Sequence, residues 1–255
     1  MPKKLPVLPT VFKAILGGLK CAYEHLGSTA MLSFIWFVCH IPFWMVLYTV
    51  WTNVTAGMPE TKEAVRVPWA LVLAGLLVTG PLLSAPVNAA VTYVVKRIHD
   101  DEAVFKDFFI GFKRYYLRSA AVYAALIVVA ALLVGNMTAA ARMQLWVSKI
   151  SLVISAYALL FLLLLSNYFF PLLVFQPNTF RKTWKKAFLL ALDNGMITVL
   201  LSVLTLALYG LAGATGVFLI LFYPAAIAHG HYLLFNTLLA KYEEAATEGS
   251  PAAAE

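Results

Sequence analysis

Five polar side chains lie inside long apolar stretches of this sequence: His40, Asn88, Asn167, His229 and His231. Imidazole and amide groups donate and accept hydrogen bonds without a net charge, so these residues predict a polar site between helices that could bind a small solute. The alternative interpretation is structural, because Asn and His also join neighbouring helices and satisfy backbone groups freed by proline. The sequence leaves both interpretations open.

The sequence does not indicate metal binding, a cofactor or catalysis. His229 and His231 are two residues apart and point to different faces of a helix, so we expect no metal site and no cofactor. The sequence contains no GxSxG, HExxH, phosphate-binding glycine loop or CxxC, and we predict no catalytic residues and no enzymatic activity. Asp193 is the acidic residue that begins an apolar run. An enzyme that processes lipids, built around Asp193 or a histidine, is therefore the weakest of our alternatives.

The two cysteines are not expected to be paired. Cys21 precedes the first apolar run and Cys39 lies inside it, so their side chains should differ in membrane depth. We predict two buried, unreactive thiols.

Composition predicts an all-helical membrane protein. Apolar residues make up 62% of the 255 residues and charged residues 12%, with a mean hydropathy of +0.83, which leaves too little polar surface for a soluble domain. Six apolar runs approach or exceed the roughly 20 residues that a hydrocarbon core requires: 28–50, 67–95, 119–138, 145–175, 189–209 and 211–239. The second contains Gly80, Pro81 and Pro86 and should be kinked or interrupted midway.

Basic and aromatic residues concentrate on one side of these runs. Fifteen Lys and Arg residues fall on that side and four on the other, which predicts that both termini are cytoplasmic. Such side chains favour anionic lipid headgroups or a protein partner, and we expect no nucleic acid. The candidate surface for headgroups or a partner consists of Arg97, Lys106, Lys113, Arg114, Arg118, Arg181, Lys182, Lys185 and Lys186.

The basic-aromatic segments also suggest an internal repeat. VFKAILGGLKCAY at 11–23 matches VFKDFFIGFKRYY at 104–116, and TFRKTWKKAF from 179 is a looser copy. We predict one domain over 1–240 with three units, at about 10–98, 103–176 and 179–240, each an amphipathic interfacial helix followed by a transmembrane hairpin. Chance similarity between amphipathic segments is the alternative. Residues 241–255 are acidic and rich in small residues, and we predict that this tail is disordered.

One stretch combines a Gly-Pro, a Tyr, a basic pair and the pattern Phe-x-Asp-Phe-Phe-x-Gly-Phe-Lys. Its residues are Gly80, Pro81, Tyr93, Lys96, Arg97, Phe105, Asp107, Phe108, Phe109, Gly111, Phe112 and Lys113. Here the chain resembles the YesL-like family of uncharacterised bacterial integral membrane proteins, with looser matches at 168–175 and 185–195. The resemblance implies the bacterial cytoplasmic (inner) membrane. Because genes of such proteins often lie among those for carbohydrate-uptake ABC transporters, it also implies an accessory or regulatory role.

Three functions are therefore expected in descending order. The first is a non-catalytic, multi-pass partner of a carbohydrate-uptake ABC transporter, interacting with membrane lipids and with transporter subunits. The second is a small-solute transporter or channel that uses the polar residues inside the spans. The third is the lipid-processing enzyme.

Overall fold

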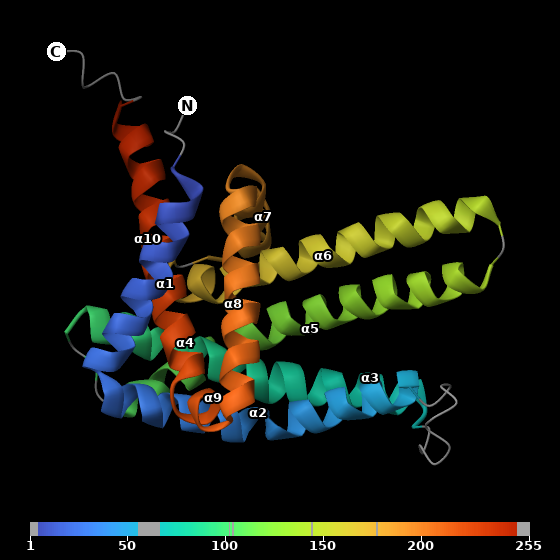
Figure 1. Ribbon diagram of the computed structural model, residues 1–255, viewed down its shortest axis with the longest axis horizontal. Coiled ribbons are helices and arrows are strands. Elements are labelled where there is room, and N and C mark those ends of the chain that lie inside the picture. The colour runs from blue at the N-terminus through green and yellow to red at the C-terminus, as the bar shows by residue number, and fades with distance from the viewer. Residues whose placement is uncertain are drawn as a thin grey trace.

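The computed structural model describes residues 5–55, 67–101, 103, 105–143, 145–176 and 178–248. Every regular element in these ranges is a helix, as composition predicts (Figure 1). In chain order they are α1 (Val7–Glu24), α2 (Leu26–Thr55), α3 (Trp69–Thr79), the π-helical turn η1 (Gly80–Ser84), α4 (Ala85–His99), α5 (Lys106–Arg142), α6 (Trp146–Phe175), α7 (Phe180–Asp193), α8 (Gly195–Thr215), α9 (Val217–Leu221) and α10 (Tyr223–Glu248).

Five helical segments in the described ranges are long and apolar enough to cross a membrane, as expected of a multi-pass membrane protein. They are Leu26–Thr52, Trp69–His99, Lys106–Arg142, Trp146–Phe175 and Gly195–Thr215. Large apolar side chains remain exposed on the outer faces of α5 and α6, Leu132 and Tyr157 among them. An exposed apolar face of this kind is suited to contact with lipid chains.

The sixth predicted span, 211–239, is divided in the structure. α8 ends at Thr215 because Gly216 adopts a positive φ of 62°, and a further break at Phe222 separates α9 from α10. α10 carries His229, His231 and several charged residues, and it is not among the five helices apolar enough to span. Five of the six expected spans therefore correspond, within the described residues, to helices long and apolar enough to cross a membrane.

Two further boundaries differ from those expected. The interfacial helix expected at 104–116 and the span expected at 119–138 form one continuous helix, α5, because no proline or glycine separates them. By contrast, the backbone leaves the helical region at His25 and at Asn194, so α1 and α7 are separate helices as predicted. The tail is helical as far as Glu248, and the prediction of disorder is wrong for 241–248, where Ala, Glu and Lys favour a helix. Residues 249–255 lie outside the described ranges.

The interruption predicted in the second apolar run is present. Gly80–Ser84 forms a π-helical turn between α3 and α4. Pro81 and Pro86 cannot donate backbone hydrogen bonds there, which loosens the regular helical pattern. A Cβ atom on Gly80 would lie 2.7 Å from Cδ1 of Ile127, so glycine also permits the close approach of α5. This turn ends four residues before Asn88.

α10 occupies the centre of the packing. It contacts α1 most extensively and also α2, α4, α6 and α8. Its buried side chains belong to both main apolar clusters: one joins it to α1, α5, α6, α7 and α8, and the other joins it to α2, α4 and α5. Figure 1 shows α5 and α6 as a long hairpin, whereas α1, α8 and α10 run across its direction. Polar residues on α10 are therefore held between several helices.

Candidate functional site

The structure separates the five polar candidates into two places. Asn88, Asn167 and His231 line one pocket, and His40 lies directly behind Asn88. His229, on a different face of α10, does not line this pocket and contacts His99 instead. The prediction that His229 and His231 point to different faces is confirmed, whereas the grouping of His229 with His40 and Asn88 in one site is wrong. Helical spacing fixes the face of a residue, but packing decides its partners.

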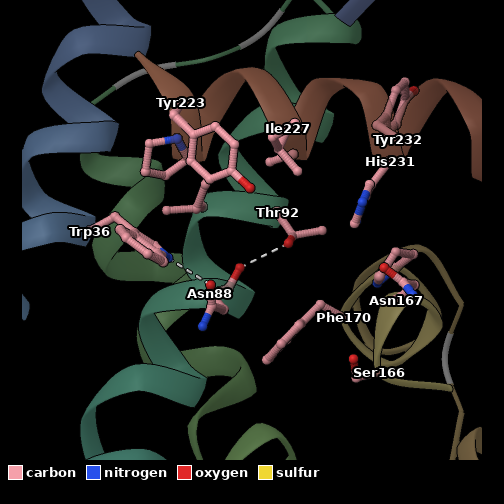
Figure 2. A pocket seen from close by; sticks show the side chains of 14 residues that line it. Trp36, Asn88, Thr92, Ser166, Asn167, Phe170, Tyr223, Ile227, His231 and Tyr232 are labelled. Carbon is pink, nitrogen blue, oxygen red and sulfur yellow. Dashed lines mark hydrogen bonds between the residues drawn. The ribbon is translucent and has the colours of Figure 1, made fainter. Parts of the chain in front are cut away.

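The pocket is bounded by four helices and has a volume of about 240 Å³. α2 contributes Trp36, and α4 contributes Asn88 and Thr92, while side chains of α6 and α10 close the opposite sides (Figure 2). Its hydroxyl, amide and imidazole groups are Asn88, Thr92, Ser166, Asn167, Tyr223, His231 and Tyr232. No Asp, Glu, Lys or Arg is among the lining residues of the described chain. The site is therefore polar but uncharged.

Asn88 is fixed in place by a network in which each group has a defined role. Indole Nε1 of Trp36 donates to Oδ1 of Asn88 at 2.7 Å, and Nδ2 of Asn88 donates to the Ser84 carbonyl at 2.9 Å. Nδ1 of His40 lies 2.7 Å from the carbonyl oxygen of Trp36, so this nitrogen carries the proton and donates it. Nε2 of His40 is then free to accept from Nδ2 of Asn88 at 3.3 Å. The rings of Trp36 and His40 also stack, with centroids 3.9 Å apart. His40 thus orients Asn88 and does not line the pocket itself.

Asn167 and His231 present polar atoms from the opposite side. Nδ2 of Asn167 donates to Oγ of Ser202 at 2.8 Å and to the Leu164 carbonyl at 3.0 Å, which anchors its amide between α6 and α8. Nε2 of His231 is buried and has no hydrogen-bond partner among the described residues. Its ring extends from α10 towards α6 in the pocket (Figure 2). A buried nitrogen without a partner is costly, so a polar group that reached it would be favourable.

Sequence inspection missed several residues of the pocket, although their spacing contains a signal. Trp36 lies four residues before His40, and Thr92 lies four residues after Asn88. Residues at this spacing share a helix face, so extending each polar candidate by one turn would have found both. Tyr223 and Tyr232 offer no such signal, because their inclusion depends on where α10 crosses α4 and α6.

The basic surface predicted from sequence is divided by the structure. Arg97 pairs with the buried Asp107, with 3.6 Å between Nε and Oδ2, and Lys186 donates to Oε1 of Gln176 at 2.5 Å. These two side chains are half-buried and hold helices together. The other seven are exposed: Lys106, Lys113, Arg114, Arg118, Arg181, Lys182 and Lys185. Only the exposed set is available to a headgroup or partner.

Asp193 is hydrogen-bonded to two side chains of α10. Its Oδ2 accepts hydrogen bonds from Nζ of Lys241, at 2.9 Å, and from the hydroxyl of Tyr242. These two donors hold the pKa of the Asp193 carboxyl below its ordinary value, the Tyr242 hydroxyl contributing most. Asp193 therefore ties the end of α7 to α10 and does not line the pocket.

Comparison with known proteins assigns neither a family nor a function to the chain. No family model matches the chain, and neither a curated protein nor a solved structure matches it. Membership of the YesL-like family stays a prediction from sequence.

Proposed function

We propose that the protein is a non-catalytic membrane transporter whose Asn88–Asn167–His231 pocket binds a small uncharged polar solute. The observation that carries this proposal is the uncharged polar lining of the pocket together with the unpartnered Nε2 of His231. A solute group that reached this nitrogen and formed a hydrogen bond with it would satisfy it.

Charge and size narrow the class of solute. Because the lining residues carry no formal charge of Asp, Glu, Lys or Arg, an ionised solute would be buried without a counter-charge, which is costly. The volume of about 240 Å³ lies just below the range of about 300–1,000 Å³ typical of pockets for drug-sized ligands. A hydroxyl-rich molecule fits both conditions. A sugar belongs to this class, in keeping with the carbohydrate connection that the YesL-like resemblance implies.

Solute flux tests the proposal. The purified protein, reconstituted in liposomes, is expected to take up uncharged hydroxyl-rich solutes from a panel running from glycerol to glucose, and to exclude glucose 6-phosphate. His231→Leu and Asn167→Leu should each lower uptake by about tenfold or more, because one lost hydrogen bond to a buried group is worth about 1.4 kcal/mol or more. Asn236→Leu is the matched control, since Asn236 is exposed on the same helix as His231.

Equilibrium dialysis with the same panel separates binding from transport. Uptake that is unchanged in His231→Leu and Asn167→Leu, or the absence of both binding and uptake for the whole panel, would refute the proposal. Binding without uptake would also overturn the transport step and favour the accessory role considered next.

An accessory or regulatory role beside a carbohydrate-uptake ABC transporter is the second candidate. It is supported by the seven exposed basic residues, which are not used in packing helices together. Reversing three of them on α5, Lys113, Arg114 and Arg118, to Glu should release co-purifying transporter subunits or anionic lipid while the protein still inserts. Mass spectrometry of the protein purified from its host in mild detergent measures this. Unchanged insertion with an unchanged set of partners contradicts this role.

A further proposal concerns topology. We infer three units with six spans in a bacterial cytoplasmic membrane, with both termini cytoplasmic. The support is a shared packing pattern, in which α1 contacts α10, α5 contacts α4 and α7 contacts α6. In each pair, the helix that begins one predicted unit packs on the last helix of another.

A further inference from the structure

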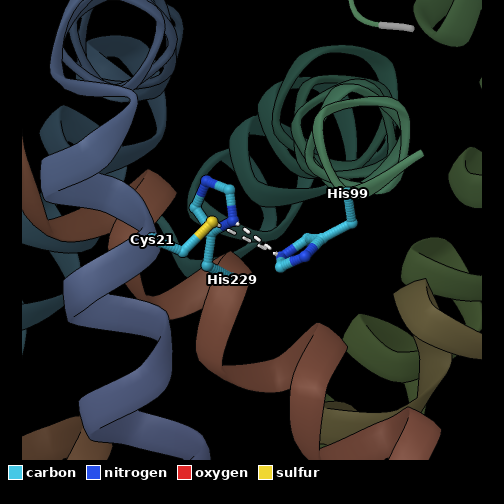
Figure 3. Close-up of side chains that lie close together, drawn as sticks. All are labelled: Cys21, His99 and His229. Atoms are coloured by element: carbon cyan, nitrogen blue, oxygen red, sulfur yellow. Dashed lines mark hydrogen bonds between the residues drawn. The ribbon is translucent and has the colours of Figure 1, made fainter. Parts of the chain in front are cut away.

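Three residues from distant parts of the chain bring metal-binding atoms together on the far side of α10 from the pocket. Cys21 lies on α1, His99 at the end of α4, and His229 on α10 (Figure 3). Nε2 of His99 is 3.1 Å from Nδ1 of His229 and 3.8 Å from Sγ of Cys21. All three ligand atoms lie within 4.8 Å of one another. They form a triangle that one ion could occupy.

The size of this triangle is close to that of a metal site. Zinc bonds of about 2.0–2.1 Å to nitrogen and about 2.3 Å to sulfur place tetrahedral ligand atoms about 3.4 Å apart for two nitrogens and about 3.6 Å apart for nitrogen and sulfur. The two distances from Nε2 of His99, to Nδ1 of His229 and to Sγ of Cys21, differ from these by only a few tenths of an ångström, and the third side of the triangle is within 4.8 Å. A bound ion would need little rearrangement of the helices.

The surroundings hold the ligands in position and leave a route to them. The ring of His99 stacks on Tyr232 with centroids 4.2 Å apart, and His229 is fully buried. Cys21 and His99 also line a second, more open cavity of about 320 Å³. That cavity is lined as well by three further donors, Glu24, His25 and Asp101. It therefore provides both an entry path and a place for a fourth ligand or a water.

We propose that Sγ of Cys21, Nε2 of His99 and Nδ1 of His229 bind a single zinc-type divalent transition metal ion, whose fourth position faces the open cavity. Mixed thiolate and imidazole donors suit zinc and its cobalt substitute, whereas magnesium and calcium prefer oxygen. The site lies outside the solute pocket and does not depend on solute binding. It departs from the expectations of no metal site and of an unreactive thiol at Cys21.

Without metal, the same three groups would form a hydrogen-bonded cluster. One proton would then lie between His99 and His229, and burial together with the nearby Glu24 raises the pKa of the Cys21 thiol, which keeps it protonated. A bound metal displaces the thiol proton. The metal-bound form and the hydrogen-bonded form can therefore be told apart at the sulfur atom.

Cobalt binding tests the proposal on the full chain, purified without a polyhistidine tag and treated with a chelator. The expected result is saturation at about one Co²⁺ per chain, with tetrahedral d–d bands, a thiolate-to-cobalt charge-transfer band, and loss of both on adding Zn²⁺. Cys21→Ser should remove the charge-transfer band, and His229→Asn should weaken Co²⁺ binding by at least about tenfold. The matched controls are Cys39→Ser, which changes the other free cysteine, and His231→Asn, two residues along α10. Both should bind Co²⁺ as the unaltered protein does.

Thiol labelling keeps the test decisive if the Cys21 or His229 variant does not fold. In Cys39→Ser protein, only Cys21 can react with a maleimide, and Zn²⁺ should slow that reaction by about tenfold or more. Absence of a thiolate-to-cobalt band in the folded protein, or labelling that is indifferent to Zn²⁺, would overturn the proposal and leave a hydrogen-bonded cluster only. A charge-transfer band that persists in a folded Cys21→Ser variant would overturn it equally.

Discussion

Replacing Gly18 by alanine should lower the free energy of unfolding by about 2 kcal/mol, a large effect for the addition of one methyl group. A Cβ atom at Gly18 would lie 2.4 Å from the backbone nitrogen and 2.6 Å from the Cα atom of Gly230, where α1 crosses α10. Backbone atoms cannot turn aside as a side chain can, so the cost lies near the upper end, about 3 kcal/mol, of the range for overpacking. The higher helix propensity of alanine offsets about 1 kcal/mol of it.

Denaturant unfolding in detergent, followed by circular dichroism, measures this effect. Gly135→Ala is the matched control, because Gly135 is also inside a helix and a Cβ atom there would have no neighbouring atom within 4 Å, so that this variant should be slightly stabilised. Gly18→Leu should prevent α1 from docking altogether. Equal stability of Gly18→Ala and the unaltered protein would show that α1 and α10 do not cross at this point. Because Cys21 and His229 lie on these two helices, Gly18→Leu should also abolish Co²⁺ binding, and Gly18→Ala should weaken it.

Removing the carboxylate of Asp193 should destabilise the fold by about 2 kcal/mol. The Lys241 side chain is only 6% exposed and lies 2.9 Å from Oδ2 of Asp193, so Asp193→Ala leaves a buried ammonium group without its counter-charge. Breaking a fully buried pair costs about 3–5 kcal/mol, but Asp193 is 47% exposed and Oδ1 of Asn194, 3.0 Å from Lys241, remains as an acceptor. Because Asp193 is partly exposed and Asn194 remains as an acceptor, we expect a cost of about 2 kcal/mol, below that of breaking a fully buried pair.

A second substitution distinguishes the ion pair from simple loss of packing. Adding Lys241→Met to Asp193→Ala removes the unpaired charge and should recover most of the lost stability. Glu24→Ala is the control, since its pair with Lys20 is solvent-exposed and long, at 3.8 Å, and should contribute less than about 0.5 kcal/mol. A double variant no more stable than Asp193→Ala would contradict the assigned role of Lys241.

The same carboxylate gives a pH dependence with a definite sign. The pKa of Asp193 is lower in the folded state than its ordinary value of 3.8, so the folded protein favours the ionised form. Its contribution to stability is fully present above the unfolded pKa and is lost as the pH falls through the folded pKa. Between about pH 5 and the acid limit of the fold, the unaltered protein should therefore lose more stability than Asp193→Ala. If the unaltered protein and Asp193→Ala lost the same stability over this pH range, the lowered pKa assigned to Asp193 would be contradicted.

Local sequence determines much of the helical framework. Apolar runs of sufficient length specify helices because the backbone must satisfy its own hydrogen bonds in hydrocarbon. Gly80, Pro81 and Pro86 specify the interruption before Asn88, since proline lacks the donor that an unbroken helix needs. The opposite orientations of His229 and His231 follow from helical geometry alone. Each of these features depends on residues only a few positions apart.

Helix boundaries were less predictable where two local tendencies compete. The basic segment from 104 and the apolar run from 119 look like two elements by composition, yet α5 continues through both because nothing between them disrupts its hydrogen bonds. In the last apolar run, Gly216 takes up a left-handed conformation that most residues avoid, and the helix ends there. Composition alone does not reveal which glycine will adopt this conformation.

Only tertiary structure decides which polar side chains meet. Cys21 and His99 are 78 residues apart and His99 and His229 are 130 apart, and neither pair is related by helical spacing. They come together because α1 crosses α10 closely at Gly18 and Gly230, and because α4 packs on the same helix. Hydrophobic periodicity indicates which face of a helix is buried, but many helices offer a similar apolar face. The choice of partner depends on the fit of side chains across the whole bundle, and that fit places His231 at the pocket and His229 beside Cys21.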